Sequence, residues 1–258
     1  MKDTEPCSPR TGAEALLLSL KAAGIDRLYV NSGTDFTPII EAYASLDAAL
    51  VPQPVVVTHE TAVVAMAHGD YLATGRMQAA IVHVNVGLAN SAMGLINAAS
   101  DNVPVLMLSG RTPLTESGRP GSRRSPVQYG QEMYNQASLV SDVVKFHYEL
   151  RYPDQAPDVI RRAVEIGLSE PRGPVYVSLP REPLAAPVEY PVRIRPAVPA
   201  LPPSAPDAAV QQAAAILTAA QRPLIVAQRA DAAGAAAIAE FARTHRIPVV
   251  EPFTMRSV

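Results

Sequence analysis

The sequence contains a single cysteine, Cys7, among its 258 residues. One cysteine excludes an intrachain disulfide and a zinc site built from several thiolates. The formal net charge is only −2, so the chain has no excess of charge that would attract nucleic acid or an anionic membrane surface. We therefore expect neither nucleic acid nor a membrane among its partners.

Long hydrophobic runs are also missing. The longest apolar run near the start, residues 15–18, is too short for the hydrophobic region of a secretory signal. No segment reaches the roughly 20 apolar residues that a membrane-spanning helix needs. Hydrophobic residues still make up 48% of the chain and charged residues 18%, enough for a sizeable core. The expectation is a soluble cytoplasmic protein.

Three common catalytic or phosphate-binding motifs are absent: G-x-G-x-x-G after a strand, the Walker A sequence and the G-x-S-x-G elbow. His59, Glu60 and His68 suggest a metal site at first sight. However, the two histidines are nine residues apart, which places them on opposite sides of a helix. The zinc-binding motif H-E-x-x-H is absent, and we predict no metal site in this chain.

Up to about residue 180, stretches with helical periodicity alternate with short β-branched runs. The runs are nearly continuously apolar, as in strands covered on both faces. They occupy residues 27–30, 54–58, 79–84, 103–109 and 173–179, and the helical stretches occupy 13–24, 36–46, 61–75, 90–100 and 154–170. This alternation predicts a doubly wound α/β domain with a mainly parallel sheet. Ligands of such sheets bind at the carboxyl ends of the strands.

Prolines mark a boundary, because eight of the 25 lie between residues 183 and 206. Proline removes backbone donors and favours extended backbone, so we predict a semi-rigid linker there. The predicted organisation is an N-terminal domain over 1–182, the linker over 183–206 and the start of a second α/β domain over 207–258. Helices at 207–220 and 234–245 alternate in that last part with strands at 223–227 and 247–251. Two strands are a thin basis for an independent sheet domain, so we interpret this region as part of a larger domain.

Glu60 is the first candidate functional residue. It comes after the run 54–58, which we read as a short buried strand, and it precedes a helix of small residues that Gly75 closes. A carboxylate at the tip of a core strand costs free energy unless chemistry or a partner charge uses it. The alternative is an acid at a strand end without a function.

Four separated motifs resemble the thiamine diphosphate (ThDP)-dependent 2-keto acid enzymes, which include acetolactate synthase and benzoylformate decarboxylase. They are GIDRLYVNSGTDFTPIIEAY, HETAVVAMAHGDYLATG, VGLANSAMGLINAASDNVPVLMLSGRTP and EPRGPVYVSLPREP. The motifs keep the family's order, and the resemblance covers essentially the whole chain. It implies the family's N-terminal, pyrimidine-binding domain followed by part of its Rossmann-like central domain.

The resemblance implies a mechanism for Glu60. In this family a glutamate at this position hydrogen-bonds the aminopyrimidine ring of ThDP and favours its imino tautomer. The imino nitrogen then removes the thiazolium proton, and the resulting carbanion attacks the carbonyl of a 2-keto acid. The cofactor acts as the electron sink after carbon dioxide leaves.

Further residues match cofactor-binding positions of the family. Asn85, Gly87 and Asn90 stand where relatives carry an SGPG..N turn, although the leading residues of that turn are replaced here. Gly87 would let the backbone approach the cofactor closely, and Asn90 would alternatively cap the next helix. Gln131 matches a glutamine that points at the cofactor in carboligating relatives.

His83 and Thr34 match substrate-binding positions. His83 stands where benzoylformate decarboxylase-like members carry an active-site histidine, which would move a proton at the substrate. The alternative is a structural histidine at a strand end. Thr34 matches a hydroxyl that holds the substrate carboxylate, or it stabilises its turn. The basic segment 118–134 is read mainly as a solvated loop, with a lid or anion-attracting loop as the alternative.

The resulting prediction is the N-terminal part of a ThDP-dependent enzyme that decarboxylates a 2-keto acid, as benzoylformate decarboxylase does. Acetolactate synthase-like carboligation is the alternative, and a non-catalytic interaction subunit is another. In the family the diphosphate and its Mg²⁺ bind through a third domain with a GDG…N motif, which is absent from this sequence, and the site forms between subunits. The implied partner is a second copy, in a homodimer or tetramer, or a complementary diphosphate-binding chain; the isolated chain would be inactive. Some relatives hold FAD, for which this sequence gives no support.

Overall fold

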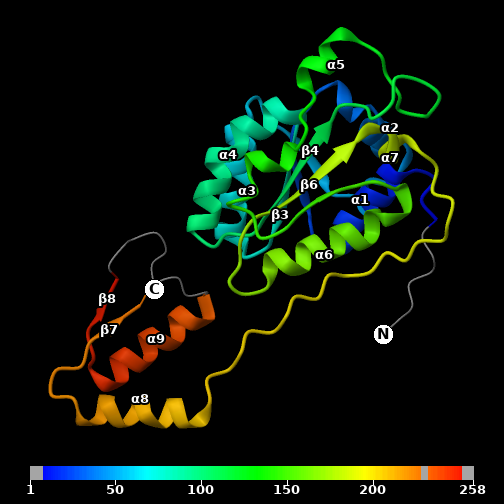
Figure 1. Cartoon of the computed structure of the whole chain (residues 1–258). Coiled ribbons are helices and arrows are strands. Elements are labelled where there is room, and N and C mark those ends of the chain that lie inside the picture. Colours follow the sequence, from blue (N-terminus) through cyan, green and yellow to red (C-terminus); the bar gives the residue numbers. More distant parts are fainter. Residues whose placement is uncertain (1–7, 228–231, 252–258) are drawn as a thin grey trace. The chain divides into compact units, whose positions relative to one another are not determined.

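A computed structural model describes residues 8–227 and 232–251 (Figure 1). Cys7 lies outside the described residues. The chain divides into two compact units, Met1–Leu201 and Pro202–Val258, and each is described by itself. The domain boundaries at 182 and 206 stay predictions.

The first unit is built on a sheet of six strands in the order β2-β1-β3-β4-β6-β5. Every neighbouring pair in the sheet is parallel. The strands are β1 (Arg27–Asn31), β2 (Gln53–Val56), β3 (Gln78–Val82), β4 (Val105–Arg111), β5 (His147–Glu149) and β6 (Val175–Pro180). The predicted fold class is therefore confirmed.

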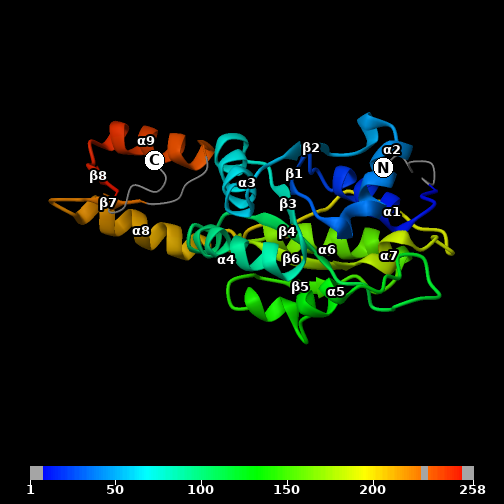
Figure 2. The same ribbon diagram turned by 90° about the horizontal axis from the view of Figure 1, so that it is seen from above.

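Helices cover both faces of this sheet (Figures 1 and 2). Two hydrophobic cores result, one on each face. The first core packs under α1 (Gly12–Ala22), α2 (Thr37–Ser45), α6 (Ala156–Leu168) and α7 (Arg181–Ala185), and the second under α3 (Glu60–Thr74) and α4 (Val84–Ser100). A short helix, α5 (Pro126–Gln131), lies between β4 and β5, and 3₁₀ turns occur at Thr34–Phe36, Ala48–Leu50, Gln136–Leu139 and Pro153–Gln155.

The two cores follow from the alternation of side chains along each strand. Leu28 and Val30 of β1 belong to the first core, whereas Tyr29 between them belongs to the second. The central strand β3 is buried at all five positions. Apolar runs without polar alternation are therefore the expected sequence pattern of this sheet.

The structure corrects two sequence predictions at the edges of the sheet. The run before Glu60 is not a buried strand, because β2 lies at the edge and Val56 is 81% exposed. β2 also ends at Val56, so Glu60 begins α3 instead of ending a strand. At the other edge, β5 was not predicted, since its three residues contain no apolar run.

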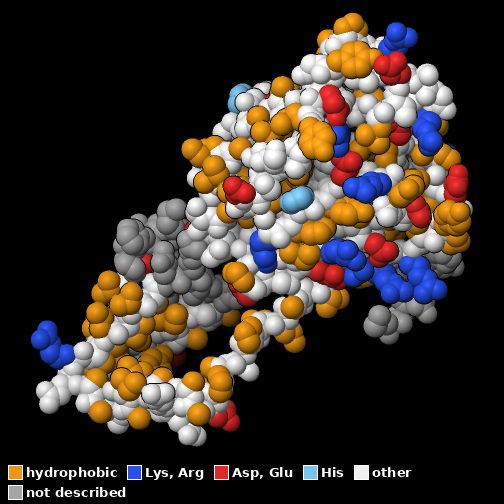
Figure 3. All heavy atoms as spheres, in the orientation of Figure 1, with side chains coloured by type: hydrophobic (Ala, Val, Ile, Leu, Met, Phe, Trp, Pro, Cys, Tyr) orange, Lys and Arg blue, Asp and Glu red, His pale blue; other side chains and the backbone are white. Residues whose placement is uncertain are grey.

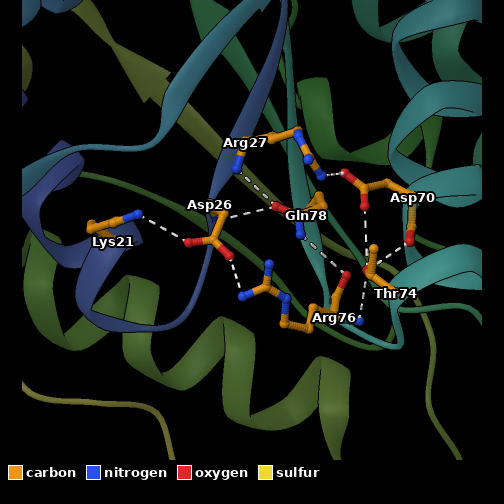
Figure 4. Close-up of polar contacts among 7 residues, drawn as sticks. All are labelled: Lys21, Asp26, Arg27, Asp70, Thr74, Arg76 and Gln78. Atoms are coloured by element: carbon orange, nitrogen blue, oxygen red, sulfur yellow. Dashed lines mark hydrogen bonds and ion pairs between the residues drawn. The ribbon is translucent and has the colours of Figure 1, made fainter. Parts of the chain in front are cut away.

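Polar side chains tie the amino ends of β1 and β3 together (Figure 4). Gln78, fully buried, accepts the backbone N–H groups of Asp26 and Arg27 at 3.1 and 2.9 Å. Asp26 pairs in turn with Lys21 at 3.0 Å and with Arg76. The Gln78 side chain thus pairs two backbone N–H groups at the start of β1. An apolar side chain at this position would leave both unpaired.

Asp70 of α3 joins the same network. Its carboxylate accepts from Arg27 at 2.7 Å and from the Tyr29 hydroxyl at 2.8 Å. Burial raises the pKa of Asp70, but the hydrogen bonds from Arg27 and Tyr29 outweigh this and hold the pKa below its usual value. Burial, together with Asp70, raises the pKa of Tyr29 to about 12.

The second unit contains α8 (Asp207–Ala219), β7 (Ile225–Val226), α9 (Ala232–His245) and β8 (Val249–Val250), with β7 and β8 parallel. These are the four elements that the sequence predicts for this region. Among the described residues of this unit, only Ala242 and Ile247 count as buried hydrophobics. Figure 3 shows hydrophobic side chains exposed over α8. Val210 and Ile216 of this helix are 55% and 63% exposed.

The first residues of the predicted linker belong to α7 or contact the start of the described chain. Residues 183–185 complete α7, Pro187 bridges to Thr11, and the Val188 N–H donates to the Arg10 carbonyl at 3.0 Å. The segment without regular structure therefore begins after Pro187. Within the described ranges, no helix combines the length and the apolar character needed to cross a membrane.

Removing the negative charge of Asp70, which bonds Arg27 and Tyr29 of β1, should destabilise the fold. We expect Asp70→Asn to lower the free energy of unfolding by about 1–3 kcal/mol, because Arg27 and Tyr29 lose a charged acceptor. Chemical denaturation of the two proteins at pH 7 measures this difference. Asp158→Asn is the matched control, since that side chain is 76% exposed in its pair with Arg161, where surface pairs contribute little.

The effect of Asp70→Asn should depend on pH. The lowered pKa of Asp70 in the fold gives stability that is present above the unfolded pKa of about 3.9. It is lost as the pH falls through the folded pKa. The difference between wild type and variant should therefore shrink below about pH 4, and a difference that stays constant would contradict the assignment.

Candidate functional site

The candidate site lies where the strand order of the sheet reverses. β1 continues to β2 on one side, whereas β3 continues to β4 on the other. In doubly wound sheets this switch point, at the carboxyl ends of the strands, is the usual ligand site. Thr34 and Asp35 come after β1 there, and His83 comes directly after β3.

Asp35 and His83 meet at this point. Asp35 Oδ1 lies 2.5 Å from His83 Nδ1, and Asp35 Oδ2 accepts the Val84 N–H at 3.3 Å. A carboxylate only accepts, so Nδ1 carries the proton and Nε2 is left to accept. The amide nitrogen of Gln131 faces Nε2 at 3.1 Å and donates to it.

Two glycines make room for this pair. A Cβ at Gly33 would lie 2.1 Å from His83 Nδ1, and a Cβ at Gly110 would lie 1.5 Å from Asp35 Oδ2. Any larger residue at either position would displace the ring or the carboxylate. The Asp35 side chain is 4% exposed and that of His83 is 21% exposed, so the ring retains an accessible edge.

The segment after His83 differs from the prediction. Asn85, Gly87 and Asn90 lie in α4, which begins at Val84, and not in a turn. The residue at the helix N-cap is His83, so the interpretation of Asn90 as a helix cap is wrong. Val84 has a φ of +33°, which is a strained value for a β-branched residue.

The first turns of α4 lie against β3. A Cβ at Gly87 would meet the Val82 side chain at 2.9 Å, so the glycine lets the helix approach the strand. Asn85 Oδ1 is buried without a hydrogen-bond partner among the described residues. Contacts of Asn85 and Gly87 with a cofactor stay predictions.

Glu60 stands at the first position of α3. His59 caps this helix by accepting the Thr61 N–H at 3.2 Å, and an acid in the first turn is favoured by the helix dipole. The Glu60 side chain is 15% exposed, and its Oε2 accepts from Asn90 Nδ2 at 3.2 Å. Oε1 has no hydrogen bond within the described part of the chain, so it can accept one from a ligand.

The basic segment reaches the site through Arg123. Its Nη1 donates to Thr34 Oγ1 at 2.8 Å in an exposed hydrogen bond, so the reading of this segment as a solvated loop stays a prediction. Arg124 fits that reading, because it is 79% exposed beside Glu116. The same segment ends on α5, whose last residue is Gln131.

The predicted residues thus fall into two groups. Thr34, His83 and Gln131 lie around Asp35, while Glu60 contacts Asn90. Sequence reasoning named neither Asp35 nor Arg123 as a site residue, although Asp35 stands in the polar turn after β1, where a ligand site was expected. No group of three His, Cys, Asp or Glu side chains suited to a metal ion occurs within residues 8–227 and 232–251.

Residues 10–139, half of the chain, match the family model described as "Thiamine pyrophosphate enzyme, N-terminal TPP binding domain". The matched stretch includes α1 and ends at the 3₁₀ turn Gln136–Leu139. All of the residues predicted from sequence for the site lie inside it, and so do Asp35 and Arg123.

Curated relatives are similar to the same part of the chain. An acetolactate synthase of Arthrospira platensis is 27% identical over 74% of this chain. A probable acetolactate synthase large subunit of Methanocaldococcus jannaschii is 26% identical over 84%, and the acetolactate synthase large subunit of Lactococcus lactis subsp. lactis is 23% identical over 70%. The aligned parts make up 31%, 35% and 30% of those proteins, so the chain spans about a third of their length.

Replacing Asp35 should change the tautomer of His83. In the wild type we expect neutral His83 to carry its proton on Nδ1, because Asp35 only accepts. In Asp35→Asn this requirement is lost, and part of the population should carry the proton on Nε2. Ring ¹⁵N chemical shifts of His83 measure this change; the His68 ring, which faces Asp101 instead, is the internal control. An unchanged His83 spectrum would show that Asp35 does not set the tautomer.

Proposed function

The chain belongs to the thiamine pyrophosphate enzyme family through its N-terminal TPP-binding domain, and we propose that it supplies the pyrimidine half of a ThDP site acting on 2-keto acids. The observation that carries this proposal is the position of Glu60. Its carboxylate is mostly buried at the start of α3, is held by Asn90 and keeps one oxygen free to accept. Such an acceptor fits a ring N–H of the cofactor's pyrimidine.

Glu60 and Asn90 each have a definite task in this proposal. Glu60 would hold a proton at its Oε1, and the Asn90 amide would fix the carboxylate through Oε2. ThDP, when bound, supplies the nucleophile for the keto carbon and the electron sink for decarboxylation. Low exposure to water would strengthen the bond that Glu60 makes.

For the reaction, acetolactate synthase-like carboligation is our first proposal. The relatives that cover most of this chain are named acetolactate synthases. They support the carboligase alternative better than the benzoylformate decarboxylase-like reading. Gln131, which faces the site beside His83, is consistent with the glutamine of carboligating relatives.

Simple decarboxylation is the second candidate, and His83 is the observation that favours it. The Asp35 carboxylate orients the ring through Nδ1, and Nε2 faces the Gln131 amide; the side chain is 21% exposed. A histidine held in this way can take and return a proton at the substrate. The same Asp35–His83 arrangement would serve the first step of carboligation as well.

We further propose that α3 and α4 pack against another chain, either a second copy or a diphosphate-binding partner that holds Mg²⁺, with the assembly in the cytoplasm. α4 contains no charged residue over its 17 positions. Its Met93 is 62% exposed and Ile96 is 44% exposed, and α3 exposes Leu72 by 47%. Hydrophobic side chains gather over these helices in Figure 3, and contiguous apolar surface of this kind marks interaction sites.

Glu60→Gln tests the cofactor role. In an assembly of this chain with a diphosphate-binding domain, ThDP and Mg²⁺, we expect consumption of pyruvate to fall by about 10²-fold or more. The amide cannot hold the proton, but it keeps the size of the side chain. Glu41→Gln, on the exposed face of α2, is the matched control and should stay within about twofold. Full activity of Glu60→Gln would refute the proposed function.

His83→Ala tests whether His83 takes part in the reaction, and the products of the wild type distinguish carboligation from simple decarboxylation. The aldehyde and acetolactate-type products of the same assembly are quantified from one pyruvate incubation. If His83 transfers the proton, the rate of carbon dioxide release should fall by about 10²-fold. An unchanged rate of carbon dioxide release would show that His83 transfers no proton in the reaction. Dominance of acetolactate-type products in the wild type would support the first proposal over the second.

A further inference from the structure

We propose that Arg111 is a positioning residue, which holds the Gln131 amide against the His83 ring. It acts through the two residues that follow Gln131, without a hydrogen bond of its own to Gln131 or His83 among the described residues. The contact between Gln131 and His83 belongs to the site described above, and its consequence for the reaction rests on the proposed function. Neither the sequence motifs nor the family match gives Arg111 a role.

Arg111 is the last residue of β4, at the carboxyl edge of the sheet. Its backbone lies opposite Pro180, the last residue of β6, so the pairing of two interior strands fixes it. The Arg111 side chain is only 15% exposed. Burial and strand pairing together make this guanidinium a fixed point at the end of the sheet.

The Arg111 guanidinium joins β5 to the segment after α5. On one side, Nη1 donates to Glu149 Oε2 at the end of β5. On the other side, Nη2 donates to Glu132 Oε1 at 2.6 Å and to the Met133 carbonyl at 3.1 Å. Burial lowers the pKa of Arg111, but its hydrogen bonds to the two glutamates outweigh this effect and raise the pKa above its usual value. The arginine therefore stays charged and bonds both carboxylates at once.

The helix α5 by itself does little to fix the position of Gln131. It has six residues, fewer than a helix that is stable on its own. Only Gln128 of these is buried, so core packing contributes little to the placement of the helix. Gln131 is its last residue, and Glu132 and Met133 follow directly. The bonds from Arg111 therefore hold the backbone immediately after Gln131.

Gln136 is a second anchor of the same segment. It is 2% exposed, and its Nε2 donates to Ser109 Oγ and to the Gly110 carbonyl, both at 2.8 Å. Ser109 and Gly110 directly precede Arg111 in β4. Gln136 thus sets where the segment returns to the sheet, whereas Arg111 acts on the residues next to Gln131.

Removing the guanidinium would release Gln131. Glu132 and Glu149 would lose the cation between them, and two carboxylates repel each other. The Glu132 side chain is 41% exposed, so it can turn into water, and the backbone that leads to Gln131 moves with it. The amide would then leave His83 Nε2, which it faces at 3.1 Å. In the proposed reaction, both the His83 ring and the Gln131 amide would lose their fixed positions.

Ring ¹⁵N signals of His83 test the positioning role in the whole chain without cofactor. Gln131→Ala supplies the reference signal of Nε2 without its amide donor. In Arg111→Gln, we expect the Nε2 signal to move most of the way from the wild-type position to this reference. Arg111→Lys should give an intermediate position, because lysine keeps the charge but lacks the planar fork that bonds both sides at once.

Glu149→Gln is the matched control, because it weakens the bond of Arg111 to β5 and leaves the bonds to Glu132 and Met133. It should lower the melting temperature as Arg111→Gln does, with His83 Nε2 still at the wild-type position. Glu132→Ala should move the signal in the same direction as Arg111→Gln, and it carries the test if Arg111→Gln does not fold. A wild-type signal in the variant that carries the test, or an equal shift in Glu149→Gln, would overturn the proposal.

Activity separates this role from the proposed function. In the cofactor-loaded assembly, Arg111→Gln should lower the formation of acetolactate-type products about tenfold or more, as Gln131→Ala does. Arg124→Gln, which removes an exposed charge of the same segment, should stay within about twofold. If the His83 signal moves as expected but the wild-type assembly consumes no 2-keto acid, the proposed function fails and the positioning role stands. If the wild type is active and Arg111→Gln is equally active, the consequence for the reaction is overturned and the proposed function stands.

Discussion

The parallel pairing of β1 with β3 is the constraint on which the site depends. Their register runs from Leu28 opposite Ala79 to Asn31 opposite Val82, so the two strands end side by side. The turn after β1 and the start of α4 are then forced together, although Asp35 and His83 are 48 residues apart in the chain. A nearly buried carboxylate needs a partner there, and an imidazole that donates from Nδ1 provides one.

The start of α4 shows how local strain and this contact are coupled. Val84 takes a φ of +33°, a conformation that costs about 1–3 kcal/mol. Its N–H, however, donates to Asp35, which also holds His83. The helix therefore begins directly at the end of β3, and His83 is fixed by both its backbone and its ring.

The sequence predicts the interior of this fold better than its edges and its site. Continuous apolar runs identify β1, β3, β4 and β6, since strands buried on both faces need no polar alternation. An apolar run also led to the prediction that β2 is buried, which is wrong. A single sequence does not show whether an apolar strand lies at the edge or in the centre of a sheet. The start of α4 was missed because the polar and small residues after His83 resemble a turn. The bond from Arg123 to Thr34 joins residues 89 apart, and no local pattern reports such a contact.

Buried polar groups are partnered differently at the two ends of the sheet. At the amino ends, the polar side chains of Gln78 and Asp70 bond to neighbouring strands and helices (Figure 4). At the carboxyl ends, Asn85 Oδ1 and Arg181 Nε stay buried without partners among the described residues. Unsatisfied buried groups cost stability in a folded chain, so a ligand that supplied partners to these two atoms would stabilise this edge. Such a ligand would agree with the proposed site, since the carboxyl edge is the usual ligand site of a doubly wound sheet.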